Sequence, residues 1–404
     1  MAGGLPGRLI RLRTAAPPFL RDAIDRALAV EHGPIAWAKE KALVRGDIPS
    51  APAPLTTSAV RLLITPMNYA GQGREWARSA ASADTEATNL AVRVGDSLRA
   101  PSQWTVPAAV FTASRAWRAQ MRESLPLFSH VMIESFASPL GRGTGDVVRE
   151  DIAWLTEQGV RVGLICHGTD VRRPKEHIGS HRHSPFAQLS PAELTAAERS
   201  AQTNVGIAAD FDGPVFVSTP DLLSDVPWAA WLPVVVEPAR WANARGVDAV
   251  VPVVLHAPSS GPVKGSAHVD SAAGALAETG VVRYRRLQRV PAERMPEEVG
   301  AADIVVDQLL LGGYGVAACE ALAAGRVVVG NVDASVRETV RATTGMELPI
   351  VQADPDTLSD VLERLAADPG ERTRVAGAGP LFVERVHAGA MTRRVLADYL
   401  ATTA

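Results

Sequence analysis

Three short segments combine small or apolar residues with side chains of the kinds that bind anions and hydroxyl groups. In the longest, Ala302–Gly330, the apolar run Ile304–Val306 leads into Gly312-Gly313-Tyr314-Gly315 and then into a helix of small residues that contains Glu320. Glycines at a strand-to-helix turn let a ligand approach the backbone, and the N-terminus of a helix offers free N–H groups to an anion. A carboxylate among small apolar residues requires a hydroxyl or cationic partner, which a ribose diol would supply. We interpret this segment as ligand-binding; the alternative is that Glu320 reaches water from the edge of a core helix.

Lys264 and His167 lie in the other two segments, each after a predicted buried strand. Lys264 follows Val253–Leu255 and precedes a glycine, and its compact charge suits a diphosphate. His167 directly follows Val160–Cys166, at the strand end where open α/β sheets bind ligands. A solvated lysine and a structural histidine are the alternatives, and both stay open.

Two weaker candidates also follow predicted strands. Asp170 follows His167 by three residues, although Asp170 or Thr169 would equally serve to cap the next helix. The loop Gly71-Gln72-Gly73 lacks the third glycine of a dinucleotide fingerprint and fits a plain tight turn equally well.

Two other polar groups are interpreted as structural. Asp210-Phe211-Asp212 precedes Gly213-Pro214, which predicts a turn rather than a cation site. His177, His181 and His183 have no Cys or carboxylate at convincing metal-ligand spacing, which predicts a solvated loop.

Alternating strand-like and helix-like stretches must position these residues. Strands separated by helix-length segments imply parallel sheets covered by helices on both faces. The alternation forms two series that join near residue 236. The predicted strands are Val60–Thr65, Val131–Ile133, Val160–Cys166 and Pro214–Ser218 in the first series, and Val253–Leu255, Val281–Arg285, Ile304–Val306 and Val327–Val329 in the second.

The amino-acid composition excludes several classes of protein. The 404 residues suffice for two or three domains, and 47% of them are hydrophobic. A formal net charge of −3 argues against a nucleic-acid binder that relies on overall charge. Cys166 and Cys319 cannot build a disulfide framework, and no apolar run approaches the roughly 18 residues of a membrane span. We expect a cytoplasmic protein.

Residues 1–58 stand apart from both series. They contain a basic stretch, Arg8–Arg13, an amphipathic helix predicted over Phe19–Val30, and a linker over Pro49–Pro54. We interpret the helix as packing on the protein's own domain. The alternative is peripheral contact with the inner membrane face, because basic amphipathic helices favour anionic lipid.

Taken in order, the segments resemble one known family. His256-Ala-Pro-Ser…Lys264-Gly, then Ala302–Gln308, Gly313-Tyr314-Gly315 and Glu320–Gly325, resemble the GT-B fold retaining glycosyltransferases of group 1, or family 4. His167-Gly-Thr-Asp170 is similar to the acceptor-side motif of that family. The resemblance implies an α/β protein with two Rossmann-like, doubly wound parallel-sheet domains facing a central cleft. Its parts would be a helical extension and linker (1–58), an acceptor-side domain (59–236), a donor-side domain (237–384) and a final segment crossing back to the first domain (385–404).

The resemblance also implies an activity. A sugar would move from a nucleotide-diphosphate sugar, such as a UDP- or GDP-sugar, to an acceptor hydroxyl with retained configuration, and without a metal or resident cofactor. Products would be cell-envelope polysaccharides, glycoconjugates or glycosylated metabolites. The possible acceptors include lipid-linked ones. His167 would lie beside the sugar, Glu320 would hold the ribose, and Lys264 the diphosphate. Other implied contacts are Ser259, Gly312, Gly313, Tyr314 and Gly315 on the donor side, and Gly71, Gly73 and Asp170 on the acceptor side.

Two positions depart from the family pattern. Gly312 stands where the first glutamate of a pair is usual, and Ser259 stands where an arginine is usual. A second hypothesis is therefore a non-catalytic GT-B protein that binds a nucleotide or assists an active transferase. A nucleotide-sugar epimerase of the same fold is a third.

Overall fold

The computed structural model describes residues 40–401 except 42, 45, 94–100, 259, 260 and 289. The helix expected over Phe19–Val30 and the basic stretch before it lie outside the described residues. The described part of the extension lies against the first domain. Nε of Arg115 contacts Oε2 of Glu40 at 2.9 Å, and the amide of Ala51 donates to Oε1 of Gln120 at 3.2 Å.

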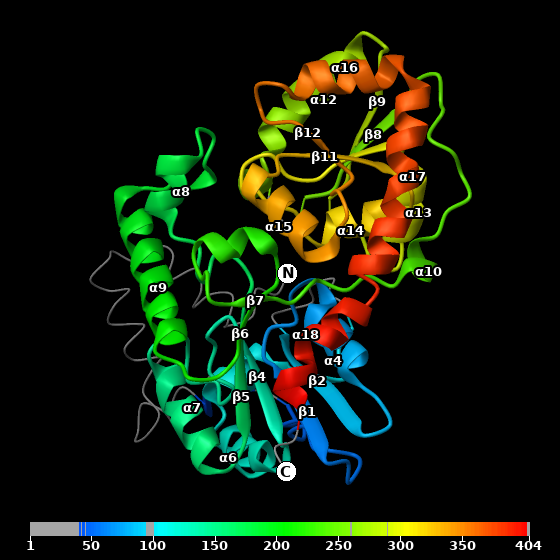
Figure 1. Cartoon of the computed structure of the whole chain (residues 1–404). Helices are drawn as coiled ribbons and strands as arrows, with labels where there is room; N and C mark the ends of the chain where they lie inside the picture. Colours follow the sequence, from blue (N-terminus) through cyan, green and yellow to red (C-terminus); the bar gives the residue numbers. More distant parts are fainter. Residues whose placement is uncertain are drawn as a thin grey trace.

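The amino-terminal domain is built on a seven-stranded parallel sheet in the order β3-β2-β1-β4-β5-β6-β7, the lower body in Figure 1. Its strands are β1 (Val60–Thr65), β2 (Thr85–Arg93), β3 (Trp104–Pro107), β4 (His130–Glu134), β5 (Arg161–Cys166), β6 (Val215–Val217) and β7 (Ala230–Trp231). Its helices are α4 (Gln72–Ala80), α5 (Ala108–Ala113), α6 (Arg115–Ser124), α7 (Val147–Glu157), α8 (Pro174–Ser180) and α9 (Pro191–Ala209), with 3₁₀ turns η1 (Tyr69–Gly71), η2 (Leu125–Leu127), η3 (Pro185–Gln188) and η4 (Pro220–Ser224).

The carboxyl-terminal domain has a five-stranded parallel sheet in the order β12-β11-β10-β8-β9. Its strands are β8 (Val253–His256), β9 (Arg283–Arg286), β10 (Ile304–Val306), β11 (Val327–Gly330) and β12 (Ile350–Gln352). The helices are α10 (Pro238–Trp241), α11 (Gly261–Lys264), α12 (Ser266–Glu278), α13 (Met295–Gly300), α14 (Val316–Ala323), α15 (Ala334–Thr344), α16 (Leu358–Ala367) and α17 (Pro369–Val386).

Central strands of both sheets are almost entirely buried, because helices cover both faces. Strand order reverses between β1 and β4 in the first sheet and between β8 and β10 in the second. Ligands of open α/β sheets bind outside the carboxyl ends of the strands at such reversal points. Each domain therefore has a binding position set by its topology.

Two chain segments cross between the domains and bond to each other. The amide of Val236 donates to the carbonyl of His387 at 2.8 Å, and Nδ1 of that histidine lies 2.8 Å from the carbonyl of Val234. Beyond the second crossing, α18 (Ala390–Leu400) lies on the first domain beside α4 (Figure 1). The hydroxyl of Tyr399 donates to the carbonyl of Arg161 at 3.1 Å, which fixes the helix to β5.

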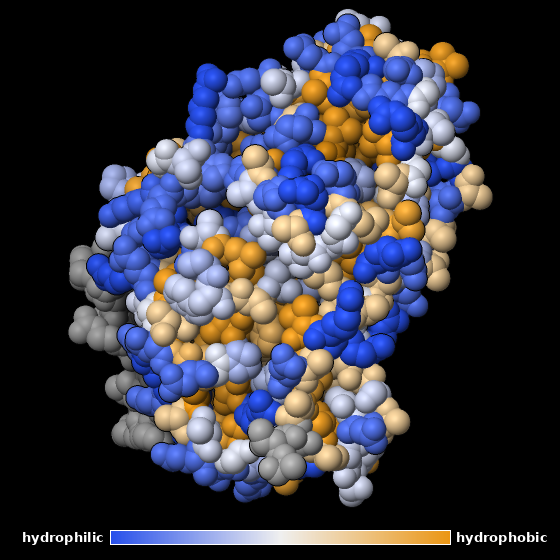
Figure 2. Space-filling model, viewed as in Figure 1, coloured by the Kyte–Doolittle hydropathy of each residue, from blue (hydrophilic) through white to orange (hydrophobic). Residues whose placement is uncertain are grey.

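Hydrophilic and hydrophobic residues share the face of the molecule that Figure 2 draws. On the face drawn in Figure 2, hydrophilic residues predominate around α8 and α9, and hydrophobic residues form separate patches. Within the part of the chain that the structure describes, no helix combines the length and the apolar character needed to cross a bilayer.

Candidate functional site

A cleft of about 850 Å³ lies between the two domains, within the usual range for ligand pockets. The amino-terminal domain lines it with the loops after β1, β4 and β5, and the carboxyl-terminal domain with the loop after β8 and the start of α14. Both strand-order reversal points thus open into one cavity. Five of the residues singled out from the sequence line it: His167, Asp170, Lys264, Gly315 and Glu320.

His167 lies at the amino-terminal wall beside a buried carboxylate, Glu134. In the parallel register of β4 and β5, Glu134 pairs with Ile165, two residues before the histidine. Nε2 of His167 lies 3.2 Å from Oε1 of Glu134, without the alignment of a hydrogen bond. The rings of Tyr69 and Trp76 pack at 5.0 and 5.5 Å from the imidazole. The histidine is therefore held on several sides at the cleft wall.

Glu134 also organises the loop after β1. Its carboxylate accepts the amides of Met67 and Asn68 at 2.8 and 3.0 Å, although the side chain is fully buried. Asn68 has a φ of 57° and Ala70 a φ of 48°, left-handed conformations that cost free energy in residues other than glycine. A Cβ atom on Gly73 would lie 3.3 Å from Oδ1 of Asn68 and 3.4 Å from the Glu134 oxygens, so Gly73 packs directly against these two side chains. Gly71 lies outside the lining of the main cleft but lines a smaller neighbouring pocket.

The Asp170 carboxylate is occupied by its own loop. It accepts the amide of His167 at 2.9 Å and that of Gly168 at 2.6 Å. The side chain therefore shapes the backbone that carries His167, and it does not cap the helix that follows.

Lys264 is paired within the carboxyl-terminal domain. Its Nζ lies 2.5 Å from Oδ1 of Asp307, a buried residue that directly follows β10. β10 and β8 are neighbours in register, Val306 beside His256, which brings the loop carrying Lys264 next to this carboxylate. The lysine thus reaches the cleft with most of its charge already balanced.

Glu320 presents a carboxylate to the cleft from α14. Burial raises its pKa from 4.5 to about 7, and the positive charges of Arg240 and Lys264 oppose that rise. No other described residue donates a hydrogen bond to this carboxylate. It is therefore free to accept one from a ligand.

The turn before α14 contributes some residues to the cleft and others to the core between the domains. Gly315 lines the cleft, whereas Tyr314 is buried with its hydroxyl 3.3 Å from Nε2 of His387. A Cβ on Gly313 would lie 2.6 Å from Cγ of Asp221, and one on Gly312 would overlap the carboxylate of Asp333. Residues 312–314 therefore pack against Asp221, Asp333 and His387 at the domain interface and lie outside the lining of the cleft. Ser259 lies outside the described residues.

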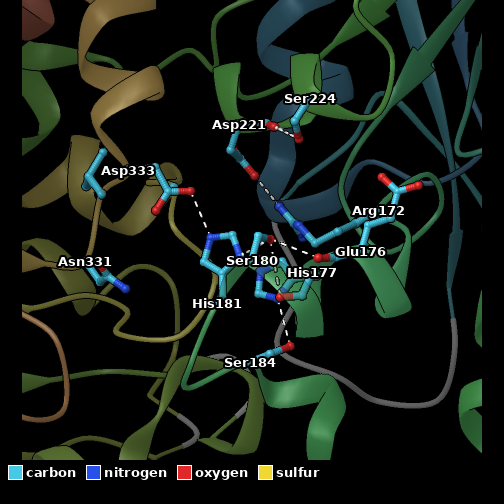
Figure 3. Close-up of polar contacts among 12 residues, drawn as sticks. Arg172, Glu176, His177, Ser180, His181, Ser184, Asp221, Ser224, Asn331 and Asp333 are labelled. Carbon is cyan, nitrogen blue, oxygen red and sulfur yellow. Dashed lines mark hydrogen bonds and ion pairs between the residues drawn. The ribbon is translucent and has the colours of Figure 1, made fainter.

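A polar cluster links the domains on that side (Figure 3). Nε2 of His181 lies 2.9 Å from Oδ2 of Asp333, and Nε2 of His183 lies 2.9 Å from Oδ2 of Asp356. His177 is buried, with its ring stacked on that of His181 and Nδ1 2.8 Å from the hydroxyl of Ser184. The prediction of a solvated loop for these histidines is wrong, because the loop reaches carboxylates of the other domain. Within the described ranges, no three His, Cys, Asp or Glu side chains gather as metal ligands.

This cluster predicts a pH-dependent stability. The hydrogen bond to Asp333 raises the pKa of His181, opposed by burial and the charge of Arg172, whereas burial lowers the pKa of His177 to about 4. A raised histidine pKa adds stability that is complete below the unfolded value and is lost as pH rises through the folded one. We expect His181→Gln to lower the free energy of unfolding by up to about 1 kcal/mol near pH 6. Near pH 9, by contrast, it should change little.

Urea unfolding at both pH values measures this effect. His268→Gln, at an exposed residue of α12 whose ring lies 6.1 Å from that of His183 but which forms no ion pair with a described residue, is the control. An equal loss at both pH values in His181→Gln would contradict the role of the charged histidine.

Comparison with known proteins places the fold. No protein-family model and no curated protein sequence matches the chain. Among solved structures, HepE from Anabaena with UDP and glucose aligns over 85% of this chain and 99% of its own, with a TM-score of 0.54 and 13% identity. Sucrose-phosphate synthase from Thermosynechococcus elongatus aligns over 84% and 98%, with a TM-score of 0.51 and 13% identity. WaaG, a glycosyltransferase of lipopolysaccharide biosynthesis, aligns over 85% and 100%, with a TM-score of 0.52 and 13% identity. The chain thus has the two-domain GT-B fold of these glycosyltransferases.

Proposed function

We propose that the protein transfers a sugar from a nucleotide-diphosphate sugar to an acceptor hydroxyl, with retention of configuration. The observation that carries the proposal is the single cleft at both strand-order reversal points. In it His167 of one domain faces the same cavity as Lys264 and Glu320 of the other. The solved complex of HepE with UDP and glucose, which has the same fold, supports a nucleotide and a sugar as ligands.

The carboxyl-terminal wall suits the nucleotide. Glu320, when ionised, can accept hydrogen bonds from a ribose diol, and the free amides at the start of α14 can donate to an anion. Val290 and Met295 give an apolar lining beside them that suits a base. We place the nucleoside diphosphate on this wall and the acceptor on the other.

The reaction then occurs between the walls. The acceptor oxygen forms a bond to the anomeric carbon on the face that the diphosphate leaves, and the bond from that carbon to the diphosphate oxygen breaks. The acceptor proton passes to the departing diphosphate. His167 lies beside the sugar in this arrangement. No resident cofactor takes part, since the nucleotide is the substrate's own leaving group.

A second candidate, a nucleotide-binding accessory protein, is favoured by two observations. Asp307 balances Lys264, and Gly312 leaves no room for a side chain next to Asp333. Such a protein would bind the nucleotide without turning over its sugar.

One experiment separates the candidates. We expect nucleoside diphosphates and their sugars to raise the melting temperature, because a ligand that binds only the folded state stabilises it. Release of nucleoside diphosphate that depends on added acceptor supports transfer. Binding without release across a panel of UDP-, GDP- and ADP-sugars and sugar acceptors would favour the accessory protein. No shift with any of these ligands would overturn both.

A further inference from the structure

The cations of the cleft differ in how far they are already neutralised. Among the described residues that line it, Arg172, Arg240 and Lys264 carry permanent positive charge. Arg172 forms a buried ion pair with Asp221, and Lys264 pairs with Asp307. An anion that bound either of these cations would compete with a carboxylate already in place.

Arg240 forms no ion pair with a described carboxylate, although its charge acts on Glu320 nearby. It projects from α10, the short helix that follows the first crossing between the domains. One NH2 group donates to the carbonyl of Ala292 at 2.7 Å, and the guanidinium carbon lies 5.8 Å from the centre of the Trp241 ring. A neutral carbonyl and a ring leave most of its five N–H donors for a ligand.

The position of Arg240 matches a phosphate group attached to a ribose. Arg240 and Glu320 line both the main cleft and the adjoining pocket of about 130 Å³, and their helices α10 and α14 are in contact. In a nucleotide the phosphate is attached two carbons beyond the ribose diol. A ribose bound at Glu320 therefore brings its phosphate within the reach of an arginine side chain on α10.

We propose that Arg240 is the phosphate-binding cation of the cleft, exchanging its bond to the Ala292 carbonyl for bonds to the ligand's phosphate oxygens. A planar guanidinium suits this role because it donates two parallel hydrogen bonds to a phosphate. The assignment deepens the proposed function and rests on it for the identity of the nucleotide. It also means that a segment joining the domains, rather than the loop after β8, supplies the decisive charge.

The test is binding calorimetry with UDP, uridine and inorganic pyrophosphate. At pH 9, above the pKa of Glu320, Arg240→Gln should weaken UDP binding about 10- to 100-fold, the range of a charge-assisted hydrogen bond, and leave uridine binding unchanged. It should also reduce the dependence of UDP affinity on salt. Arg294→Gln, an exposed residue at the start of α13, is the matched control and should bind UDP as the unmodified protein does.

The other possible results show whether the Arg240 assignment, the proposed function or both are wrong. An equal loss of UDP and uridine affinity in Arg240→Gln would overturn the proposal, because the residue would then act through Glu320 or through the first crossing between the domains. Unchanged UDP affinity would also overturn it. If the unmodified protein binds pyrophosphate through Arg240 but no nucleoside diphosphate, the proposed function fails and the anion site stands. If it binds none of the three probes, both fail.

Discussion

Replacing Glu320 by glutamine is expected to make the protein more stable near pH 8 and a weaker binder of nucleoside diphosphates. Burial raises the pKa of this carboxyl from 4.5 to about 7, so the folded protein holds its proton more tightly than the unfolded chain does. The ionised carboxylate therefore costs stability above the folded pKa. That cost disappears as pH falls through 7 toward 4.5. Glutamine has a similar shape and no charge, and so avoids the cost.

The size of the effect follows from the two pKa values. Their difference corresponds to ~3 kcal/mol in the free energy of unfolding. Urea unfolding near pH 8 should therefore show Glu320→Gln as the more stable protein, and near pH 4.5 the two should be equal. Glu278→Gln, at an exposed residue of α12, should show no such gain and serves as the control. A glutamine variant that is less stable at pH 8 would show that the carboxylate is a structural group.

The same substitution removes the acceptor proposed for the ribose diol. Loss of a charged hydrogen-bond partner should weaken UDP binding by about 1.5–3 kcal/mol. In the unmodified protein, UDP affinity should fall as pH drops below 7, because the carboxyl then takes up a proton. A residue that destabilises the fold and strengthens ligand binding is typical of a functional site. Gain of stability with unchanged UDP affinity would remove the ribose assignment.

The fold was predictable where strands are buried on both faces. β1, β5, β10 and β11 are apolar runs that can be found in the sequence, since both of their faces are covered. β2 was not predicted, because Thr85–Arg93 is partly exposed and carries polar residues along its length. β3, β7 and β12 are too short or too near an edge to give a periodic signal.

Residues that line the cleft could be picked out where they follow a strand, whereas their partners could not. His167, Lys264 and Glu320 come after predicted strands, and parallel topology brings such positions to one edge. Glu134 and Asp307 were missed, because pairing with another loop depends on strand register. Each nevertheless left a signal, a carboxylate that directly ends or follows an apolar strand and must be satisfied in the interior.

Arg240 was missed, and the three histidines were wrongly assigned to a solvated loop, for a different reason. These residues lie where the two domains meet, and the pattern of a single sequence does not predict how two domains pack together. Tyr314 shows the same limit, since its turn faces both a ligand cleft and an interdomain core. Packing between domains thus decides which residues of a glycine-rich turn remain available to a ligand.

Glu134→Ala is expected to lower both stability and turnover. The substitution leaves the amides of Met67 and Asn68 without their acceptor in a loop that is already held in left-handed conformations. An unsatisfied buried donor costs about 1–3 kcal/mol, and the cavity left by the side chain adds to the loss. The position of His167 also loses its support, and a displacement of about 1 Å at a reacting group can cost about a hundredfold in rate. UDP affinity should change little, because the nucleotide wall belongs to the other domain.

Two further variants separate the two roles of Glu134. His167→Ala should lower acceptor-dependent release of nucleoside diphosphate while leaving the loop intact. Glu134→Gln keeps one acceptor oxygen and should recover part of the stability. Hydrogen exchange of the amides at 67 and 68 reports on the loop without any turnover, and it should rise in Glu134→Ala but not in His167→Ala. If exchange stays slow in Glu134→Ala, the carboxylate does not hold the loop. The left-handed residues would then owe their conformation to packing against Trp76 and the first crossing between the domains, whose Pro233 carbonyl accepts a hydrogen bond from the Trp76 indole at 2.9 Å.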